Sequence, residues 1–129
     1  MSLTSPPLRI LYVEDNPLIV FHVEAMIEDL GYVFAGSIGS FAELVAGFDA
    51  LEVDAALVDI DLADGRTGPA AAAWLQERGI PSIFVTGQVG VAAEYPLLSL
   101  GTIAKPISAQ ELAEKLGWFP RSDLGSKRK

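Results

Sequence analysis

Side chains that bind metal ions or phosphate follow several short apolar runs in this sequence. They are Glu14 and Asp15 after the first run, Asp59 after the third, Thr86 after the fourth and Lys105 after the fifth. If these runs are strands of one parallel sheet, their carboxyl ends lie along one edge, and these side chains meet there. Carboxylates beside a hydroxyl and an ammonium group form a site suited to a divalent metal ion and a phosphoryl group.

The acidic residues favour Mg²⁺ among the metal ions. Clustered carboxylates repel one another unless a hard divalent cation lies between them, and Mg²⁺ also accepts phosphate oxygens while keeping several waters. Lys105 is a compact positive charge suited to one phosphoryl oxygen, and Thr86 with the backbone N–H of Gly87 can donate hydrogen bonds to another. We therefore predict a site that binds Mg²⁺ and a phosphoryl group together.

The apolar pattern alternates between strand-like and helix-like segments along the chain. Strict alternation implies right-handed crossovers and a parallel sheet covered by helices on both faces. We therefore predict an α/β fold, a doubly wound (βα)5 sheet with the flavodoxin-like strand order 2-1-3-4-5. The predicted strands are residues 8–13, 33–35, 55–60, 83–85 and 102–104.

Prolines, glycines and capping residues mark where the helices begin and end. Pro17 begins the first helix, and Pro69 begins the third. Ser40 and Ser108 each precede a glutamate by three residues, which is the pattern of a capping box. Three glycines and a proline interrupt residues 86–101, so we predict that the fourth helix is short or distorted.

The composition indicates one folded domain and excludes several kinds of catalytic site. The chain has 129 residues, half of them hydrophobic, with no cysteine and one histidine, which excludes thiolate catalysis, disulfides and cysteine zinc sites. A net charge of −8 argues against nucleic-acid binding, and no apolar run is long enough for membrane insertion, so we expect a cytoplasmic protein. We predict a disordered arm at residues 1–7, the domain at residues 8–120 and a disordered basic tail at residues 121–129.

In combination, four segments carry a resemblance to a known family. They are the first acidic pair and residues 58–62, 84–87 and 104–106. Together they resemble the receiver domain of two-component response regulators, and the resemblance covers nearly the whole predicted domain. It implies that Thr86 and Lys105 bind the phosphoryl group and couple it to a conformational change.

The resemblance also implies the remaining roles and the partners. Asp59 would be the phosphoacceptor, Glu14 and Asp15 would hold Mg²⁺ with it, and the backbone carbonyl of Asp61 would complete the metal shell. The donor would be a phosphohistidine in a histidine kinase or phosphotransfer protein. The domain would assist its own phosphoryl transfer and hydrolysis without being an enzyme for another substrate. Its output would pass through protein contacts of residues 87–104 and the last helix.

One position departs from the pattern of most receiver domains. Three places before the lysine they usually carry Tyr or Phe, whereas this chain has Thr102. Residues 84–87 resemble a subgroup named for the motif Phe-Ala-Thr-Gly-hydrophobic-Tyr, which also lacks that aromatic residue, although Gln88 and Val89 stand at its last two places. We therefore predict that phosphorylation orders residues 87–104.

Two other classes of function remain open. A receiver-like module that binds partners without phosphorylation is compatible with Thr102 and the interrupted fourth helix. Asp59 and Asp61 also resemble the motif of haloacid-dehalogenase-like phosphatases, but the chain lacks the adjacent acidic pair that those enzymes need downstream. A calcium-binding loop is excluded because Ala63 and Ala70 stand at ligand positions.

Overall fold

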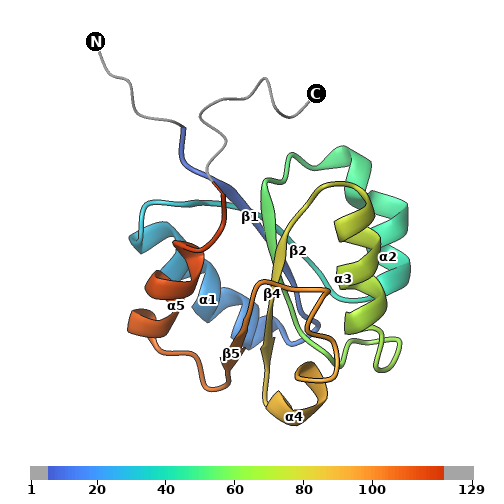
Figure 1. Cartoon of the computed structure of the whole chain (residues 1–129). Helices are drawn as coiled ribbons and strands as arrows, with labels where there is room; N and C mark the ends of the chain where they lie inside the picture. The colour runs from blue at the N-terminus through green and yellow to red at the C-terminus, as the bar shows by residue number, and fades with distance from the viewer. Residues whose placement is uncertain (1–5, 121–129) are drawn as a thin grey trace.

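The protein folds around a parallel β-sheet. The structure is a computed structural model that describes residues 6–120. Its five strands pair in parallel in the order β2-β1-β3-β4-β5, which confirms the predicted fold (Figure 1). The predicted tail at residues 121–129 and most of the predicted arm at residues 1–7 lie outside the described residues. The strands are β1 (Arg9–Val13), β2 (Val33–Ile38), β3 (Ala55–Val58), β4 (Ser82–Thr86) and β5 (Thr102–Ala104).

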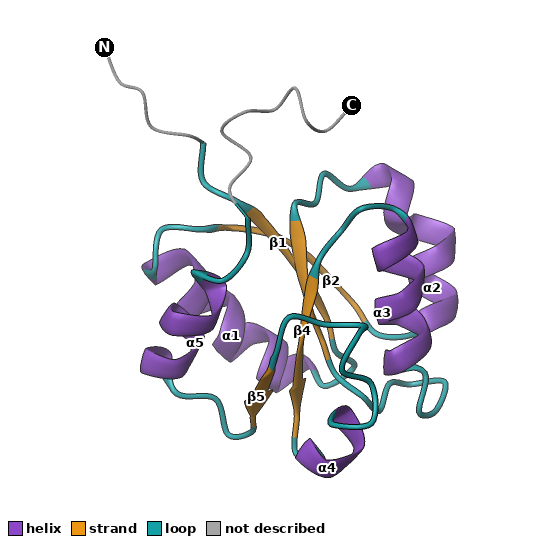
Figure 2. Cartoon of the chain, viewed as in Figure 1, coloured by secondary structure: helices purple, strands orange, loops and turns teal. Residues whose placement is uncertain are grey.

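Helices cover both faces of the sheet. Helices α1 and α5 lie on one face, and α2 and α3 lie on the other (Figure 2). Helix α4 is four residues long, as the interruptions in the sequence predicted. Within residues 6–120, no helix combines the length and the apolar character needed to cross a membrane. The helices are α1 (Pro17–Asp29), α2 (Phe41–Gly47), the 3₁₀ helix η1 (Phe48–Ala50), α3 (Gly68–Glu77), α4 (Val89–Ala92) and α5 (Ala109–Leu116).

Alternate side chains of the strands point to opposite faces of the sheet and build two cores. On β1, Ile10 and Tyr12 pack with α1 and α5, whereas Leu11 and Val13 pack with α2 and α3. All four side chains are fully buried. Because both faces are covered, the central strands are apolar throughout, which explains the continuous apolar runs in the sequence. Polar side chains are therefore confined to the ends of these strands.

Side-chain caps determine where three helices begin. Asn16 Oδ1 accepts hydrogen bonds from two backbone N–H groups of the first turn of α1, at 3.0 and 3.3 Å. The hydroxyl oxygens of Ser40 and Ser108 accept from N–H groups three residues later, at 3.0 and 3.1 Å, as predicted. Because Asn16 caps α1, the side chains of Glu14 and Asp15 are available for other interactions.

Strand boundaries differ from the sequence prediction by a few residues. Strand β2 is longer than predicted and continues to Ile38. Its register with β1 shifts just before Gly36, which adopts a φ of 141°. Strand β3 ends at Val58 rather than at Ile60. Asp59 therefore lies immediately beyond the strand, at the carboxyl edge of the sheet.

Candidate functional site

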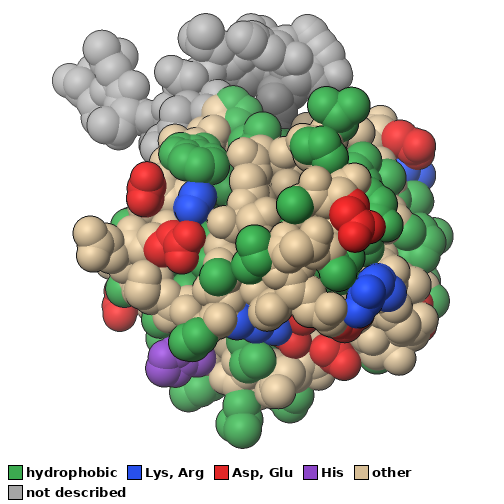
Figure 3. All heavy atoms as spheres, turned by 60° about the horizontal axis from the view of Figure 1, so that its bottom comes forward, with side chains coloured by type: hydrophobic (Ala, Val, Ile, Leu, Met, Phe, Trp, Pro, Cys, Tyr) green, Lys and Arg blue, Asp and Glu red, His purple; other side chains and the backbone are tan. Residues whose placement is uncertain are grey.

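Backbone hydrogen bonds bring the predicted site residues to one edge of the sheet. The N–H of Asp59 donates to the carbonyl of Val13 at 2.9 Å, which places the end of β3 beside the end of β1. The N–H of Lys105 donates to the carbonyl of Thr86 at 3.0 Å, which places β5 beside β4. Figure 3 shows acidic and basic side chains side by side near the middle of this edge, with hydrophobic side chains around them.

Lys105 joins two acidic side chains at this edge. Its Nζ lies 2.7 Å from Glu14 Oε1 and 2.9 Å from Asp59 Oδ2. The side chains of Glu14, Asp59 and Lys105 are 2%, 10% and 21% exposed. Ionised carboxylates are buried to this extent only when a cation or hydrogen-bond donors compensate their charge. Lys105 supplies that positive charge to both residues.

The two carboxylates differ in the number of donors that bind them. Besides the lysine, Glu14 Oε1 accepts from the Tyr12 hydroxyl at 3.3 Å, and Glu14 Oε2 accepts from the N–H of Asn16 at 3.0 Å. Asp59 Oδ1 accepts from the N–H of Ile60 at 2.7 Å. Among residues 6–120, only the lysine ammonium group donates to Asp59 Oδ2. Asp59 therefore has the more accessible carboxylate oxygen.

The buried charges shift two pKa values at the site. Burial alone would lower the pKa of the Lys105 ammonium group, but its hydrogen bonds to Glu14 and Asp59 outweigh burial and raise the pKa above its usual value. Burial raises the pKa of the Tyr12 hydroxyl, and the negative charges of Glu14 and Asp59 raise it further. Lys105 is thus held in its charged form and Tyr12 in its neutral, hydrogen-donating form.

Thr86 and Gly87 lie at the end of β4, the strand that pairs with β3. Thr86 is buried, and its hydroxyl oxygen accepts a hydrogen bond from the N–H of Gln88 at 2.9 Å. The hydroxyl proton remains available to another acceptor. Gly87 is exposed, and a Cβ atom at this position would meet no atom within 4 Å. Both predicted hydrogen-bond donors are therefore close to β3, the strand that Asp59 follows.

The Asp61 side chain accepts hydrogen bonds from two residues whose role at this site was not predicted from the sequence. Arg66 Nε lies 3.0 Å from Asp61 Oδ1, and Arg66 Nη2 lies 2.9 Å from Gln88 Oε1. Gln88 Nε2 donates in turn to Asp61 Oδ2. A loop arginine gives no sequence signal, because its partners depend on which loops are neighbours. Since protein groups engage the Asp61 side chain, its backbone carbonyl is the part available for the predicted metal shell.

The carboxylates are oxygen ligands of the kind that Mg²⁺ prefers, so the donor set fits this ion. Within residues 6–120, however, no three acidic or histidine side chains form a ready metal-binding group. Asp15 is exposed, and Lys105 contacts both Glu14 and Asp59. A metal ion bound by Glu14 Oε1 or Asp59 Oδ2 would therefore share that oxygen with the ammonium group.

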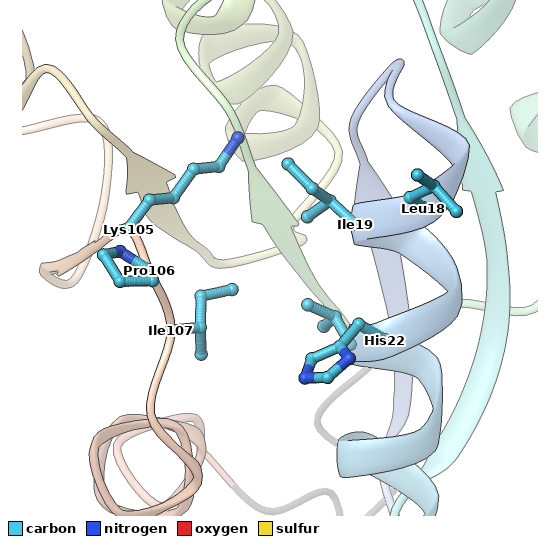
Figure 4. Close-up of a pocket in the computed structure, with 7 residues that line it drawn as sticks. Leu18, Ile19, His22, Lys105, Pro106 and Ile107 are labelled. Carbon is cyan, nitrogen blue, oxygen red and sulfur yellow. The ribbon is translucent and has the colours of Figure 1, made fainter.

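An apolar groove lies beside Lys105, between α1 and the segment that follows β5 (Figure 4). Its volume is about 490 Å³. Leu18, which lines the groove, is 79% exposed. Phe21, also on α1, is exposed but lines a different hollow, beside Glu14 and Asp15. The apolar lining residues are Leu18, Ile19, Val23, Pro106 and Ile107.

A comparison of the sequence with protein families agrees with the strand order and with the charged residues at the carboxyl edge of the sheet. Residues 10–117 match the response regulator receiver domain. The chain belongs to this family. The matched residues run from β1 to the end of α5, so the receiver domain contains every site residue described above. Receiver domains are signalling modules, in agreement with the resemblance seen in the sequence.

Two curated relatives are a sensor protein and a regulator. This receiver domain is 31% identical over 123 residues to the sensor protein GacS of Pseudomonas syringae pv. syringae, a match that covers 84% of this chain and 14% of GacS. It is 37% identical over 80 residues to the phyllosphere-induced regulator PhyR of Methylorubrum extorquens, covering 60% of this chain and 30% of PhyR. The chain thus spans less than a third of the length of either relative.

One solved structure adds information on metal binding. It is the receiver domain of the sensor histidine kinase PA1611 from Pseudomonas aeruginosa PAO1, with a magnesium ion coordinated in its active site cleft. The two chains are 28% identical with a TM-score of 0.72, and the match covers 88% of this chain and 97% of the other.

Proposed function

We propose that this receiver domain accepts a phosphoryl group on Asp59 from a phosphohistidine in a histidine kinase or phosphotransfer protein. The observation that carries the proposal is the 2.9 Å contact between Asp59 Oδ2 and Lys105 Nζ. Glu14 is bound by three donors, whereas Asp59 Oδ2 is bound by the lysine alone among the described residues. Asp59 therefore has the oxygen better suited to act as a nucleophile.

In the proposed transfer, a carboxylate oxygen of Asp59 attacks the phosphorus atom in line with the bond to the donor histidine. A P–O bond forms, the P–N bond breaks, and its electron pair returns to the imidazole ring. Lys105 neutralises negative charge on the phosphoryl oxygens, and the Thr86 hydroxyl and Gly87 N–H donate hydrogen bonds to them. The protein groups thus stabilise the charge that spreads over the phosphoryl group.

Glu14, Asp15, Asp59 and the backbone carbonyl of Asp61 are the groups proposed to hold Mg²⁺. Their oxygen chemistry supports this assignment, as does the magnesium ion described in the PA1611 receiver domain. When bound, the ion supplies positive charge that offsets repulsion between carboxylate and phosphoryl oxygens. The domain thereby assists both its own phosphorylation and the later hydrolysis of the phosphoryl group from Asp59.

Two exposed surfaces are proposed to bind partners. A donor has to bring its phosphohistidine to Asp59, and the apolar groove with Leu18 on its α1 side lies next to Lys105. Phe21 is a second exposed apolar side chain of α1. The output surface is proposed to be residues 87–104 with α5. Leu97 and Leu100 are exposed there, and so is Trp118, two residues after α5. Grouped exposed hydrophobic side chains are typical of protein interfaces. The cell compartment proposed for these contacts is the cytoplasm.

Labelling with acetyl phosphate and Mg²⁺ tests the acceptor. Wild-type protein should acquire a hydroxylamine-sensitive phosphoryl group, and Asp59→Asn should acquire none. Asp49→Asn, which changes an exposed acid in η1, is the matched control and should be labelled like wild type. Labelling of Asp59→Asn would contradict the assignment. If the wild-type protein takes no label, the phosphorylation-independent interaction module becomes the better account.

The donor surface is tested by changing the source of the phosphoryl group. Phe21→Ala should slow transfer from a phosphohistidine protein but leave labelling by acetyl phosphate unchanged, because the small donor needs no docking surface. Val45→Ala, at an exposed position on α2, is the control. Equal protein-to-protein transfer rates in the two variants would contradict docking on α1.

A further inference from the structure

The side chains of Asp61, Arg66 and Gln88, here called the clasp, join two loops at the carboxyl edge. Asp61 and Arg66 belong to the loop between β3 and α3, and Gln88 lies between β4 and α4. Each of the three side chains is hydrogen-bonded to both of the others. The clasp therefore connects the loop that follows Asp59 to the loop that follows Thr86.

Gln88 links the clasp to the Thr86 hydroxyl. Its side chain is part of the clasp, and its backbone N–H donates to Thr86 Oγ1 at 2.9 Å. Because that oxygen accepts from Gln88, the hydroxyl proton is directed toward a different acceptor. Gln88 is also the N-cap residue of α4, a helix of four residues, and its side chain makes no capping hydrogen bond to that helix. The clasp thus supplies a restraint that the helix start itself lacks.

We propose that Arg66 is a positioning residue for phosphoryl binding. By holding Gln88 against Asp61, it keeps the Thr86 hydroxyl in place before the phosphoryl group arrives, so less conformational freedom is lost on binding. The planar guanidinium group is suited to this role because it donates from two nitrogens in fixed directions. The inference rests on the proposed function and adds a residue to it.

The exposure of the clasp sets the expected size of its effect. The side chains of Arg66 and Asp61 are 51% and 46% exposed, so water and salt weaken their interaction. Exposed ion pairs contribute little, and we expect a change of about threefold in affinity for a phosphoryl mimic. Arg66 therefore adjusts phosphoryl binding, whereas Asp59 and Lys105 make it possible.

Beryllofluoride with Mg²⁺, a mimic of the phosphoryl group, is the probe. In Arg66→Ala the half-saturating concentration should rise about threefold, and amide exchange at residues 87–92 should be faster even without the mimic. Gln88→Ala should give a similar rise, and the double variant should show no further rise, because both residues act through the same clasp. Arg78→Ala, which removes an exposed arginine after α3, is the control and should match wild type.

The outcomes separate this inference from the proposed function. If wild-type protein binds beryllofluoride but Arg66→Ala matches Arg78→Ala in affinity or in amide exchange, the inference is overturned and the phosphoacceptor proposal stands. Additive effects in the double variant would also overturn it. If wild-type protein binds no beryllofluoride and Asp59 takes no label, the proposed function fails, and the role of Arg66 fails with it.

Discussion

The ammonium nitrogen of Lys105 lies 2.9 Å from a carboxylate oxygen of Asp59, although 46 positions separate the two residues in the chain. Strands β3 and β5 are both neighbours of β4, so the two residues leave the sheet at the same edge, on either side of Thr86. Lys105 also contacts Glu14, which follows β1. The charge cluster is therefore a product of strand order, and no single sequence motif contains it.

Removing the lysine charge should strengthen metal binding and weaken phosphoryl acceptance. Lys105→Ala should bind Mg²⁺ about tenfold more tightly, because a cation that shares oxygens with the ion is gone. It should be phosphorylated more slowly, because charge on the phosphoryl oxygens is no longer neutralised. Magnesium titration followed by amide NMR measures the first effect. Lys115→Ala, which removes the lysine paired with Glu111 on α5, is the control; unchanged affinity in Lys105→Ala would contradict the competition.

Stability should fall at alkaline pH because of Tyr12. Its hydroxyl has a pKa raised by burial in the folded protein, so above 10.0, the ordinary pKa of this group, the unfolded chain loses a proton that the folded protein retains. The contribution is complete below pH 10.0 and is lost as pH rises toward the folded-state pKa. The raised pKa of Lys105 likewise makes the folded protein less stable as pH rises.

The alkaline prediction is checked by urea unfolding over a series of pH values. Tyr12→Phe should flatten the decline in unfolding free energy, because it removes one of the groups responsible. Tyr32→Phe, at a half-buried position packed against the same core, is the control. A decline in Tyr12→Phe as steep as in wild type would show that the buried hydroxyl is not a cause.

Asp64 caps α2 from a neighbouring loop. Its carboxylate accepts from the N–H groups of Phe41 and Ala42 at 3.2 and 3.1 Å, and from the Thr67 hydroxyl at 2.7 Å. The Thr67 hydrogen bond is the main cause of a lowered pKa of Asp64. Its stabilising effect is therefore present above pH 3.8, the ordinary value, and is lost as pH falls through the folded-state pKa.

The Asp64→Asn variant should accordingly be less stable than wild type at neutral pH. The difference should shrink as pH falls below 3.8, because the wild-type carboxylate then loses its charge. Urea unfolding at several acidic pH values measures both effects, with Asp49→Asn in η1 as the control. A difference from wild type that does not change with pH would contradict a charged cap.

The close approach of α3 to the backbone of Asp59 gives a test of the packing. The N–H of Gly68 donates to the carbonyl of Ile60 at 2.9 Å, and a Cβ atom on Gly68 would collide with the Asp59 carbonyl oxygen. Gly68→Ala should lower the unfolding free energy by about 1–3 kcal/mol, as overpacking does. Thermal unfolding measures this, and Gly47→Ala, which meets no atom within 4 Å, is the control. Equal stability of both variants would contradict the close contact.

The fold was predictable because strands, turns and caps leave independent signals. Continuous apolar runs marked the buried strands, and Ser40 and Ser108 marked helix starts that the structure confirms. Glu14 and Lys105 could be placed at one edge because each follows a strand. The roles of these residues, and membership in the subgroup without the aromatic residue at Thr102, stay predictions.

Contacts between loops could not be predicted from the sequence. The Asp64 cap on α2 and the Arg66–Gln88 hydrogen bond each join loops that become neighbours only once the sheet has formed. No periodicity or capping rule describes such pairs. The contact of Lys105 with both Glu14 and Asp59 was also not predicted, because it depends on the side-chain conformation of a flexible lysine.

The central claim is that Asp59 is the residue that carries the phosphoryl group, and the position of the modification tests it most directly. After acetyl phosphate and Mg²⁺, borohydride reduces an aspartyl phosphate to homoserine, which mass spectrometry of peptides can locate. We predict conversion at Asp59 that requires both acetyl phosphate and Mg²⁺. Conversion at Asp15 or Asp61, or a phosphorylated protein with Asp59 unconverted, would contradict the account.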